Sequence, residues 1–91
     1  MRIAYDPAAD AMHVQLVAGS PSGGRGETWV DDNGVIVDTD IDGNPQGYEF
    51  LSVRTRGVPI DTLPEQVANA VTEFITAGSL DSTRYIEREY P

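Results

Sequence analysis

The sequence contains no cysteine, no lysine and only one histidine in 91 residues, and each of these absences excludes a class of chemistry. Without cysteine, no disulfide can supplement a small hydrophobic core. Without lysine, the chain forms no Schiff base and offers no phosphate-binding lysine of the P-loop type. His13 alone cannot complete a typical transition-metal site, and we expect it to face solvent on a strand. The sequence therefore predicts no catalytic residues, no cofactor and no enzyme activity.

Basic residues are also scarce, because six arginines stand against 15 acidic residues and the net charge is -9. Nucleic-acid binding draws most of its affinity from cationic side chains, so we expect no nucleic-acid partner for the chain acting alone. No apolar run approaches the roughly 18 residues needed to cross a bilayer, and an acidic chain is repelled by anionic membrane surfaces. The first residues show no signal-peptide pattern, so we expect a cytoplasmic location and no membrane contact.

The length predicts a single domain over residues 1–91, in which 1–53 is rich in strands and 54–91 supplies a connector, a helix and a tail. At this size, folding buries only roughly 60 to 65% of the surface of the unfolded chain, so the core is small. We therefore expect marginal stability or support from a second copy of the chain.

Alternating apolar and polar residues predict a β-hairpin over residues 3–16. Its turn lies between Asp6 and Asp10. We interpret these two aspartates as turn residues rather than as a catalytic acid and base, because their spacing around a proline is typical of a tight turn.

The glycine-rich residues 18–26 predict a mobile loop, which lacks the lysine and the following helix of a phosphate-binding loop. Residues 27–30 predict a short strand that places Trp29 against the core. We assign Trp29, Tyr48, Phe50 and Phe74 to the core rather than to a stacking platform for bases, because the net charge repels phosphates.

The strongest strand pattern lies in residues 35–53, where apolar segments flank the turn residues Asp40 to Asn44. This arrangement predicts two antiparallel strands joined by a tight acidic turn. The run Val35 to Val37 is apolar on both faces of its strand, which predicts that both sides of the sheet are covered. One helix covers only one side, so we expect a second chain on the other side, in a homodimer.

Residues 63–77 carry apolar side chains at helical spacing and predict one amphipathic helix that packs across the sheet. Thr62 and Glu65 match a capping box at its start. Gly78 follows the last apolar position, where a glycine often ends a helix.

The segments on either side of this helix are less regular. Residues 55–60 predict an extended connector, so Arg54 and Arg56 share one face. This pair either offsets local acidic charge or marks a site where an acidic partner docks. The tail, residues 79–91, fits an edge strand and a short helix about equally well. Together, the elements predict an α+β fold: an antiparallel β-meander of four to five strands with one amphipathic helix on one face.

Asp38, Asp40, Asp42, Gly43 and Glu49 match the calcium-loop expression D-x-[DN]-x-[DN]-G-x5-E position for position. An EF-hand loop joins two helices, however, whereas both flanks here are strand-forming. Two interpretations stay open. The segment is either a hairpin turn whose Asp and Asn side chains accept backbone hydrogen bonds, or a weak cation site. In the second case, the metal ligands are Asp38, Asp40, Asp42 and Glu49.

Two segments, Ile3 to Leu16 and Gly34 to Leu51, contain the motifs Y-D-P-x-x-D-A and G-V-I-V-D-x-D-x-x-G-N-x-x-G-x-E. Over residues 1–51 the chain resembles the small bacterial family of domain of unknown function 2283. Pro45 departs from the aliphatic residue usual at its position. The resemblance implies a compact β-rich domain without catalytic residues to carry over, and it favours the hairpin turn. In some members the gene lies beside that of a predicted toxin, which implies an antitoxin-like role.

Charge, composition and resemblance together predict a small acidic, non-enzymatic protein-interaction module. Its expected partner is a basic protein, which the carboxylates of this chain would mask in the manner of an antitoxin. The alternative is a weak divalent-cation (calcium) binding protein that uses the acidic turn from Asp38 to Glu49.

Overall fold

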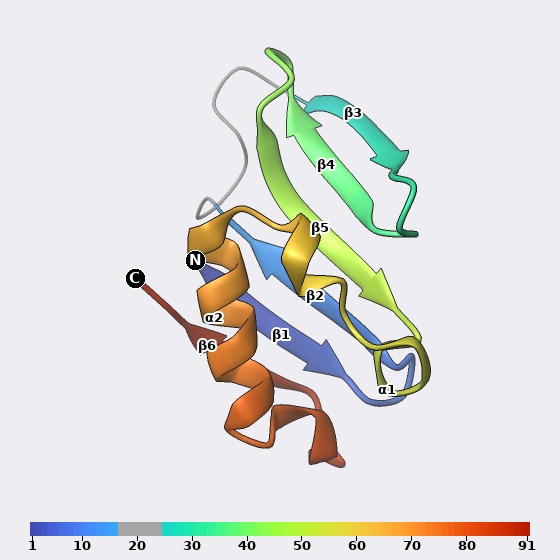
Figure 1. Ribbon diagram of the computed structural model, residues 1–91, viewed down its shortest axis with the longest axis vertical. Helices are drawn as coiled ribbons and strands as arrows, with labels where there is room; N and C mark the ends of the chain where they lie inside the picture. Colours follow the sequence, from blue (N-terminus) through green and yellow to red (C-terminus); the bar gives the residue numbers. More distant parts are fainter. Residues whose placement is uncertain (17–24) are drawn as a thin grey trace.

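The computed structural model describes residues 1–16 and 25–91, so most of the predicted loop lies outside the described residues. Six strands form one sheet in the order β3-β4-β5-β2-β1-β6, and every pair of neighbours is antiparallel (Figure 1). The strands are β1 (Arg2–Asp6), β2 (Ala11–Gln15), β3 (Arg25–Val30), β4 (Ile36–Asp40), β5 (Pro45–Leu51) and β6 (Ile86–Glu89). The predicted α+β fold is confirmed.

The two predicted hairpins are present as β1–β2 and β4–β5. One crossover interrupts the meander, because β2 pairs with β5 rather than with the next strand in sequence, β3. The sixth strand comes from the tail, whose conformation the sequence left open. Residues 86–89 pair with β1 at the edge of the sheet. Pairing with the first residues of the chain therefore determines the conformation of the tail.

The helices are α1 (Val53–Arg56) and α2 (Glu65–Thr76), with short 3-10 turns η1 (Ile60–Thr62) and η2 (Ser79–Asp81). Helix α2 lies across one face of the sheet, as predicted (Figure 1). We call this the covered face and the opposite side the open face. The prediction of an extended connector over 55–60 is wrong, because the chain forms α1 and η1 there.

The ends of α2 differ in how well they were predicted. The capping box is wrong: the Thr62 hydroxyl donates to the Pro59 carbonyl at 2.7 Å inside η1, and no side-chain hydrogen bond caps the helix. The C-terminal prediction is confirmed. Gly78 has a φ of 85°, and its N–H donates to the Ile75 carbonyl at 3.0 Å. A positive φ of this kind is the usual reason for glycine after a helix.

The core lies between α2 and the covered face of the sheet. Alternation along each strand sends one set of side chains into it. The strands contribute Ile3, Tyr5, Met12, Val14, Val37, Tyr48 and Phe50, and Val35 lies just before β4. The later segments contribute Val53, Val67, Ala70, Val71 and Phe74. Both halves of the chain therefore build the same core.

Trp29 does not pack fully against this core, which corrects the prediction. Its side chain is on the covered face, in line with Val37 and Tyr48, but it is 47% exposed. Strand β3 is the edge strand, and the helix lies over the other end of the sheet (Figure 1). The aromatic ring of Trp29 therefore packs against the protein on one side only, and its other side is exposed to solvent.

The start of β3 was also predicted incorrectly, because residue 26 belongs to this strand rather than to the loop. A Cβ at Gly26 would collide with the backbone carbonyl of Asp40 on β4. Close approach of two backbones is a reason for glycine within a strand, and it competes with the loop interpretation of a glycine-rich stretch.

The apolar run Val35 to Val37 does not have both of its faces covered by described residues. Val35 and Val37 are 1% and 3% exposed on the covered face. Ile36 points to the open face, where it is only half-buried between Val30 and Glu49 on the neighbouring strands. No described helix lies on that side of the sheet (Figure 1). The homodimer thus stays a prediction and needs a different argument.

Candidate functional site

The open face of the sheet gathers charged side chains from strands that are distant in sequence. Side chains at directly paired positions project on the same side of a sheet. Arg2 pairs with Glu89, and Ala4 pairs with both His13 and Glu87. On the other side of His13 comes Glu49 of β5. These residues, together with Asp38 of β4, form what we call the acidic sheet face: Asp38, Glu49, Glu87 and Glu89 with Arg2 and His13.

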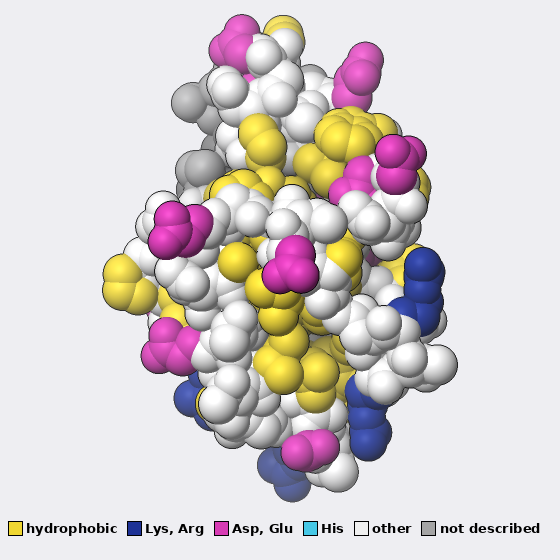
Figure 2. Space-filling view, viewed as in Figure 1, with side chains coloured by type: hydrophobic (Ala, Val, Ile, Leu, Met, Phe, Trp, Pro, Cys, Tyr) yellow, Lys and Arg dark blue, Asp and Glu magenta, His cyan; other side chains and the backbone are white. Residues whose placement is uncertain are grey.

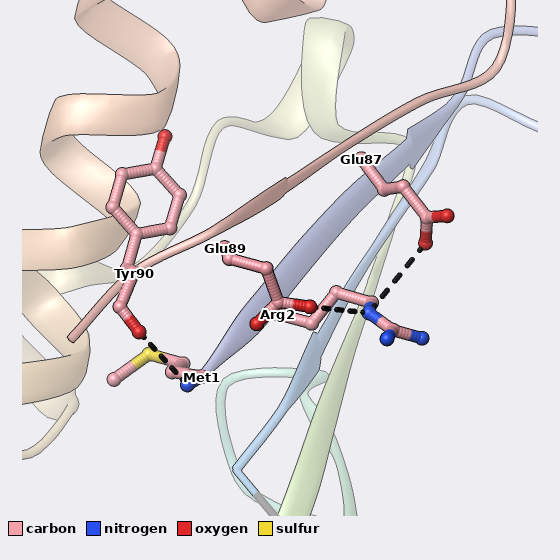
Figure 3. Close-up of polar contacts among 5 residues, drawn as sticks. All are labelled: Met1, Arg2, Glu87, Glu89 and Tyr90. Atoms are coloured by element: carbon pink, nitrogen blue, oxygen red, sulfur yellow. Dashed lines mark hydrogen bonds and ion pairs between the residues drawn. The ribbon is translucent and has the colours of Figure 1, made fainter. Parts of the chain in front are cut away.

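Arg2 is the one arginine in this set, and it is partly neutralised within it. Its Nε donates to Glu89 Oε1 at 2.8 Å and lies 3.7 Å from Glu87 Oε2 (Figure 3). The hydrogen bond and charge of Glu89 raise the pKa of the guanidinium. All three side chains are about half exposed or more, so the contacts remain open to water and to a partner. The acidic sheet face thus holds four carboxylates and one guanidinium, which contacts two of them, and the face is negative.

His13 contributes a second contact on this face. Its Nε2 lies 3.4 Å from Glu49 Oε1, and the imidazole is 52% exposed. The side chain points away from the core residues Met12 and Val14, as the alternation predicted. The Glu49 carboxylate is its charged neighbour on the paired strand.

The ends of the chain lie together beside this face. The amino group of Met1 donates to the Tyr90 carbonyl at 2.9 Å (Figure 3). The Tyr90 N–H donates to the Met1 carbonyl at 2.7 Å. These two hydrogen bonds continue the pairing of β1 with β6. They hold Glu87 and Glu89 in register with Arg2.

The acidic turn between β4 and β5 is organised by one aspartate. Asp40 Oδ1 accepts hydrogen bonds from the backbone N–H groups of Asp42 and Asn44, each at 2.9 Å. Its Oδ2 accepts from the side-chain amides of Asn44 and Gln46, each at 3.3 Å. The backbone N–H of Asn44 is the main cause that lowers the pKa of the Asp40 carboxyl. Gly43 supplies the positive φ of 85° that the turn requires.

Three of the four carboxylates proposed as calcium ligands point to different partners. Asp40 is used inside the turn, Asp38 accepts a hydrogen bond from the Thr28 hydroxyl at 2.6 Å, and Glu49 lies beside His13. Within residues 1–16 and 25–91, no group of three or more acidic or histidine side chains is arranged to hold a metal ion. These contacts are those of a hairpin turn, and cation binding by these residues stays a prediction.

Asp6 and Asp10 have separate roles in the first hairpin. Asp6 Oδ1 accepts the Ala8 N–H at 3.0 Å, which is an ordinary turn contact. Asp10 has a φ of 50°, and its Oδ1 accepts the hydroxyl of the buried Tyr5 at 2.7 Å. Burial and this hydrogen bond raise the pKa of the Tyr5 hydroxyl.

Asp10 also joins the first hairpin to α1. Its carboxylate accepts the Arg54 N–H at 3.2 and 3.3 Å, and its carbonyl accepts the Val53 N–H at 3.2 Å. The sequence pattern by itself indicates only a turn at Asp10. The five-residue spacing from Tyr5 in the Y-D-P-x-x-D-A motif is the signal that could have indicated the side-chain contact.

Arg54 and Arg56 do not form the pair that was predicted. They lie in helix α1, where residues two apart point in different directions. Arg56 extends to the turn between β3 and β4, and an added Cβ at Gly34 would be 3.0 Å from its Nη2. A half-open hollow of about 220 Å³ lies beside this contact, between Val35, Phe50, Leu51 and the segment from Arg56 to Pro59.

The covered side of the molecule has a different charge pattern. Figure 2 views the molecule from this side, and acidic side chains are scattered over it among polar and hydrophobic ones. On the open face, by contrast, strand pairing brings acidic residues into adjacent rows. The open face therefore has the more regular surface for recognition of a charged partner.

No described helix is long and apolar enough to cross a membrane.

Comparison with known proteins gives one match. No curated protein and no solved structure matches the chain. The family model described as protein of unknown function (DUF2283) matches residues 2–54, which include β1 to β5 and the Asp10 contact to α1. Because the match covers more than half of the sequence, the chain belongs to the DUF2283 family.

Proposed function

We propose that this chain is a non-enzymatic protein-interaction module that binds a basic protein through the acidic sheet face. The observation that carries the proposal is the pairing of strands that places Asp38, Glu49, Glu87 and Glu89 on one open surface, where Arg2 is the arginine paired with them among the described side chains. The exposed side chains of this antiparallel face are available to a partner without rearrangement. Charge complementarity of this kind increases the association rate and selects the partner.

The biological role that we propose is antitoxin-like. A toxin that acts on nucleic acid or on another anionic target carries basic residues, and an acidic surface that covers them blocks its action. A net charge of -9 favours such an encounter at long range and disfavours nucleic acid itself as a partner. We place this interaction in the cytoplasm and expect the chain to act as a homodimer.

The test is affinity capture in the native organism with three versions of the chain. The first is the natural sequence, and the second removes three charges from the acidic sheet face: Glu49→Gln, Glu87→Gln and Glu89→Gln. The third is a matched control that removes three charges on the covered side: Asp61→Asn, Glu65→Gln and Glu73→Gln. The two variants have the same net charge, so they differ only in which side of the molecule is neutralised.

We expect the natural chain and the control variant to capture the same small basic protein. The open-face variant should bind it about tenfold or more weakly, and binding should weaken as salt is raised. Capture of no basic protein would contradict the proposal, as would equal binding by the two variants. Circular dichroism of each variant checks that the fold is retained.

Cation binding by Asp38, Asp40, Asp42 and Glu49 is the competing hypothesis, and calorimetry distinguishes it. The Asp40 oxygens already accept hydrogen bonds from the turn, so a calcium ion would have to displace them. We therefore expect no heat of binding and no rise in Tm at millimolar calcium. A saturable heat that is lost in Asp40→Asn would favour the cation hypothesis over ours.

A further inference from the structure

The two edges of the sheet differ in how they are protected. Strand β6 forms one edge and is mostly charged, since Glu87, Arg88 and Glu89 occupy it. Charged residues on an edge strand oppose pairing with another chain. Strand β3 forms the other edge and exposes Trp29 and Val30, which are 47% and 63% accessible. Figure 2 shows hydrophobic side chains at the surface over this strand.

The backbone of β3 also has hydrogen-bonding groups to offer. The Asp31 N–H donates to the Val35 carbonyl, and both backbone groups of Glu27 contact the Thr39 hydroxyl of β4. Backbone groups alternate between the two sides of a strand, so those of Thr28 and Val30 point to the free edge. In the described part of the chain, β4 is the only strand that pairs with β3. The free edge is therefore a template for one more strand.

We propose that a second copy of this chain pairs with β3, antiparallel and with the two-fold axis at Thr28. The two sheets then form one continuous sheet, with β3 of each copy at its centre. In this register Glu27 comes opposite Trp29 of the second copy, so its carboxylate faces no like charge there.

The neighbouring registers are less favourable, which is why the axis is placed at Thr28. An axis at Trp29 sets Glu27 opposite Asp31, and an axis at Glu27 sets this carboxylate opposite its own copy. Like charges directly opposite each other destabilise a strand pair. An axis at Thr28 produces no such pair and retains the hydrogen bonds of Thr28 and Val30.

This interface is separate from the proposed function, because it uses the edge of the sheet and not its open face. A two-fold axis perpendicular to the sheet leaves the acidic faces of both copies on the same side, so a dimer presents a doubled negative surface. The contact is small compared with the roughly 1,200 Å² of a stable interface, so we expect a dissociation constant in the micromolar range. Failure of partner capture would leave this dimer unaffected, and a monomeric chain would contradict the expected homodimer but not the binding of a basic partner.

The absence of cysteine makes a direct test possible, since one introduced cysteine is the only thiol in the chain. With the axis at Thr28, the two copies of residue 28 lie opposite each other at a Cα–Cα distance of about 5.5 Å. That distance is within the range of about 4.4 to 6.8 Å that a disulfide spans. We would compare Thr28→Cys with Trp29→Cys, the neighbouring register, and with Glu87→Cys, an exposed position on the opposite edge.

We expect sedimentation equilibrium of the natural chain at about 100 µM to give a mass above that of the monomer. Val30→Pro should restore the monomer mass, because it removes an N–H that faces the free edge and β4 does not use. Val30→Lys keeps the backbone and should weaken the dimer too. Upon mild oxidation, Thr28→Cys should form the covalent dimer about tenfold faster than Trp29→Cys and Glu87→Cys. A monomer mass throughout the concentration range would overturn the proposal, as would equal rates for the three cysteine variants.

Discussion

The covered and open faces of this sheet are built from the same strands, yet they bury very different amounts of surface. Ile3, Tyr5 and Met12 are fully buried on the covered face, while the neighbouring positions Arg2 and His13 on the open face are about half exposed. Successive side chains of each strand project alternately to the covered and to the open face. Stability is therefore expected to depend on the covered face, and recognition on the open face.

The largest expected effect comes from the helix that covers the core. Phe74 of α2 is fully buried and its ring contacts that of Tyr90 edge-on, with centroids 6.5 Å apart. Phe74→Ala should lower the free energy of unfolding by about 3 to 5 kcal/mol, because it removes a large apolar side chain and leaves a cavity. Urea denaturation measures this. The adjacent exposed control, Glu73→Ala, should change it by about 0.5 kcal/mol or less.

The next effect tests the contact that joins the first hairpin to α1. Asp10→Ala leaves the buried Tyr5 hydroxyl and the Arg54 N–H without their acceptor, and it places alanine at a φ of 50°. We expect a loss of about 1 to 3 kcal/mol in urea denaturation. Asp6→Ala, in the same turn, loses one exposed hydrogen bond and should have a smaller effect. Equal effects from the two variants would show that Asp10 acts only as a turn residue.

A smaller effect is expected at the acidic turn, and it depends on pH. The hydrogen bonds to Asp40 lower its pKa from an ordinary value of 3.8, so the charged form stabilises the folded state. This stabilisation is complete above pH 3.8 and is lost as the pH falls through the lower folded value. Asp40→Asn should lower the Tm near neutral pH. The difference from the natural chain should narrow in strong acid.

Thermal unfolding from pH 6 to about 2 provides the measurement. Asp42→Asn is the matched control, because Asp42 uses its backbone N–H rather than its carboxylate in the turn. A constant Tm difference between Asp40→Asn and the natural chain over this range would be inconsistent with a role for the Asp40 charge.

The smallest effect on stability is expected on the open face. Arg2→Gln removes ion pairs to Glu87 and Glu89 that are open to water, and exposed pairs contribute little to folding. The Tm should not change measurably, whereas binding of a basic partner should strengthen because the face becomes more negative. A large loss of stability would show that the two faces do not divide their roles as we propose.

The elements with regular local sequence patterns could be predicted from the sequence. The alternation in residues 3–16 and 35–53 defined both hairpins, and the helical spacing in 63–77 defined α2 to within two residues at its start. For the candidate site, the sequence predicted the types of residue but not their arrangement in space. Its acidic residues were apparent from the sequence, but their assembly on one face depends on β6 pairing with β1, whose residues are more than 80 positions apart.

The errors share a physical cause. Trp29 was assigned to the core because aromatic residues in strands usually face it, but its strand is at an edge that α2 does not reach. Thr62 and Glu65 have the letters of a capping box, but the chain enters the helix through a 3-10 turn that uses the Thr62 hydroxyl. Each error depends on where an element ends or what lies beside it, and local sequence does not contain this information.

The sequence alone determined the elements of this protein: the hairpins, the helix, the acidic charge and the absence of cysteine and lysine chemistry. Alternation, turn residues and net charge are local or additive properties, so they can be counted along the chain. Only the tertiary structure decided the order of the strands, the pairing of the tail and the contact of Asp10 with α1. Those features join residues far apart in sequence, and their free energy comes from contacts that exist only after the chain has folded.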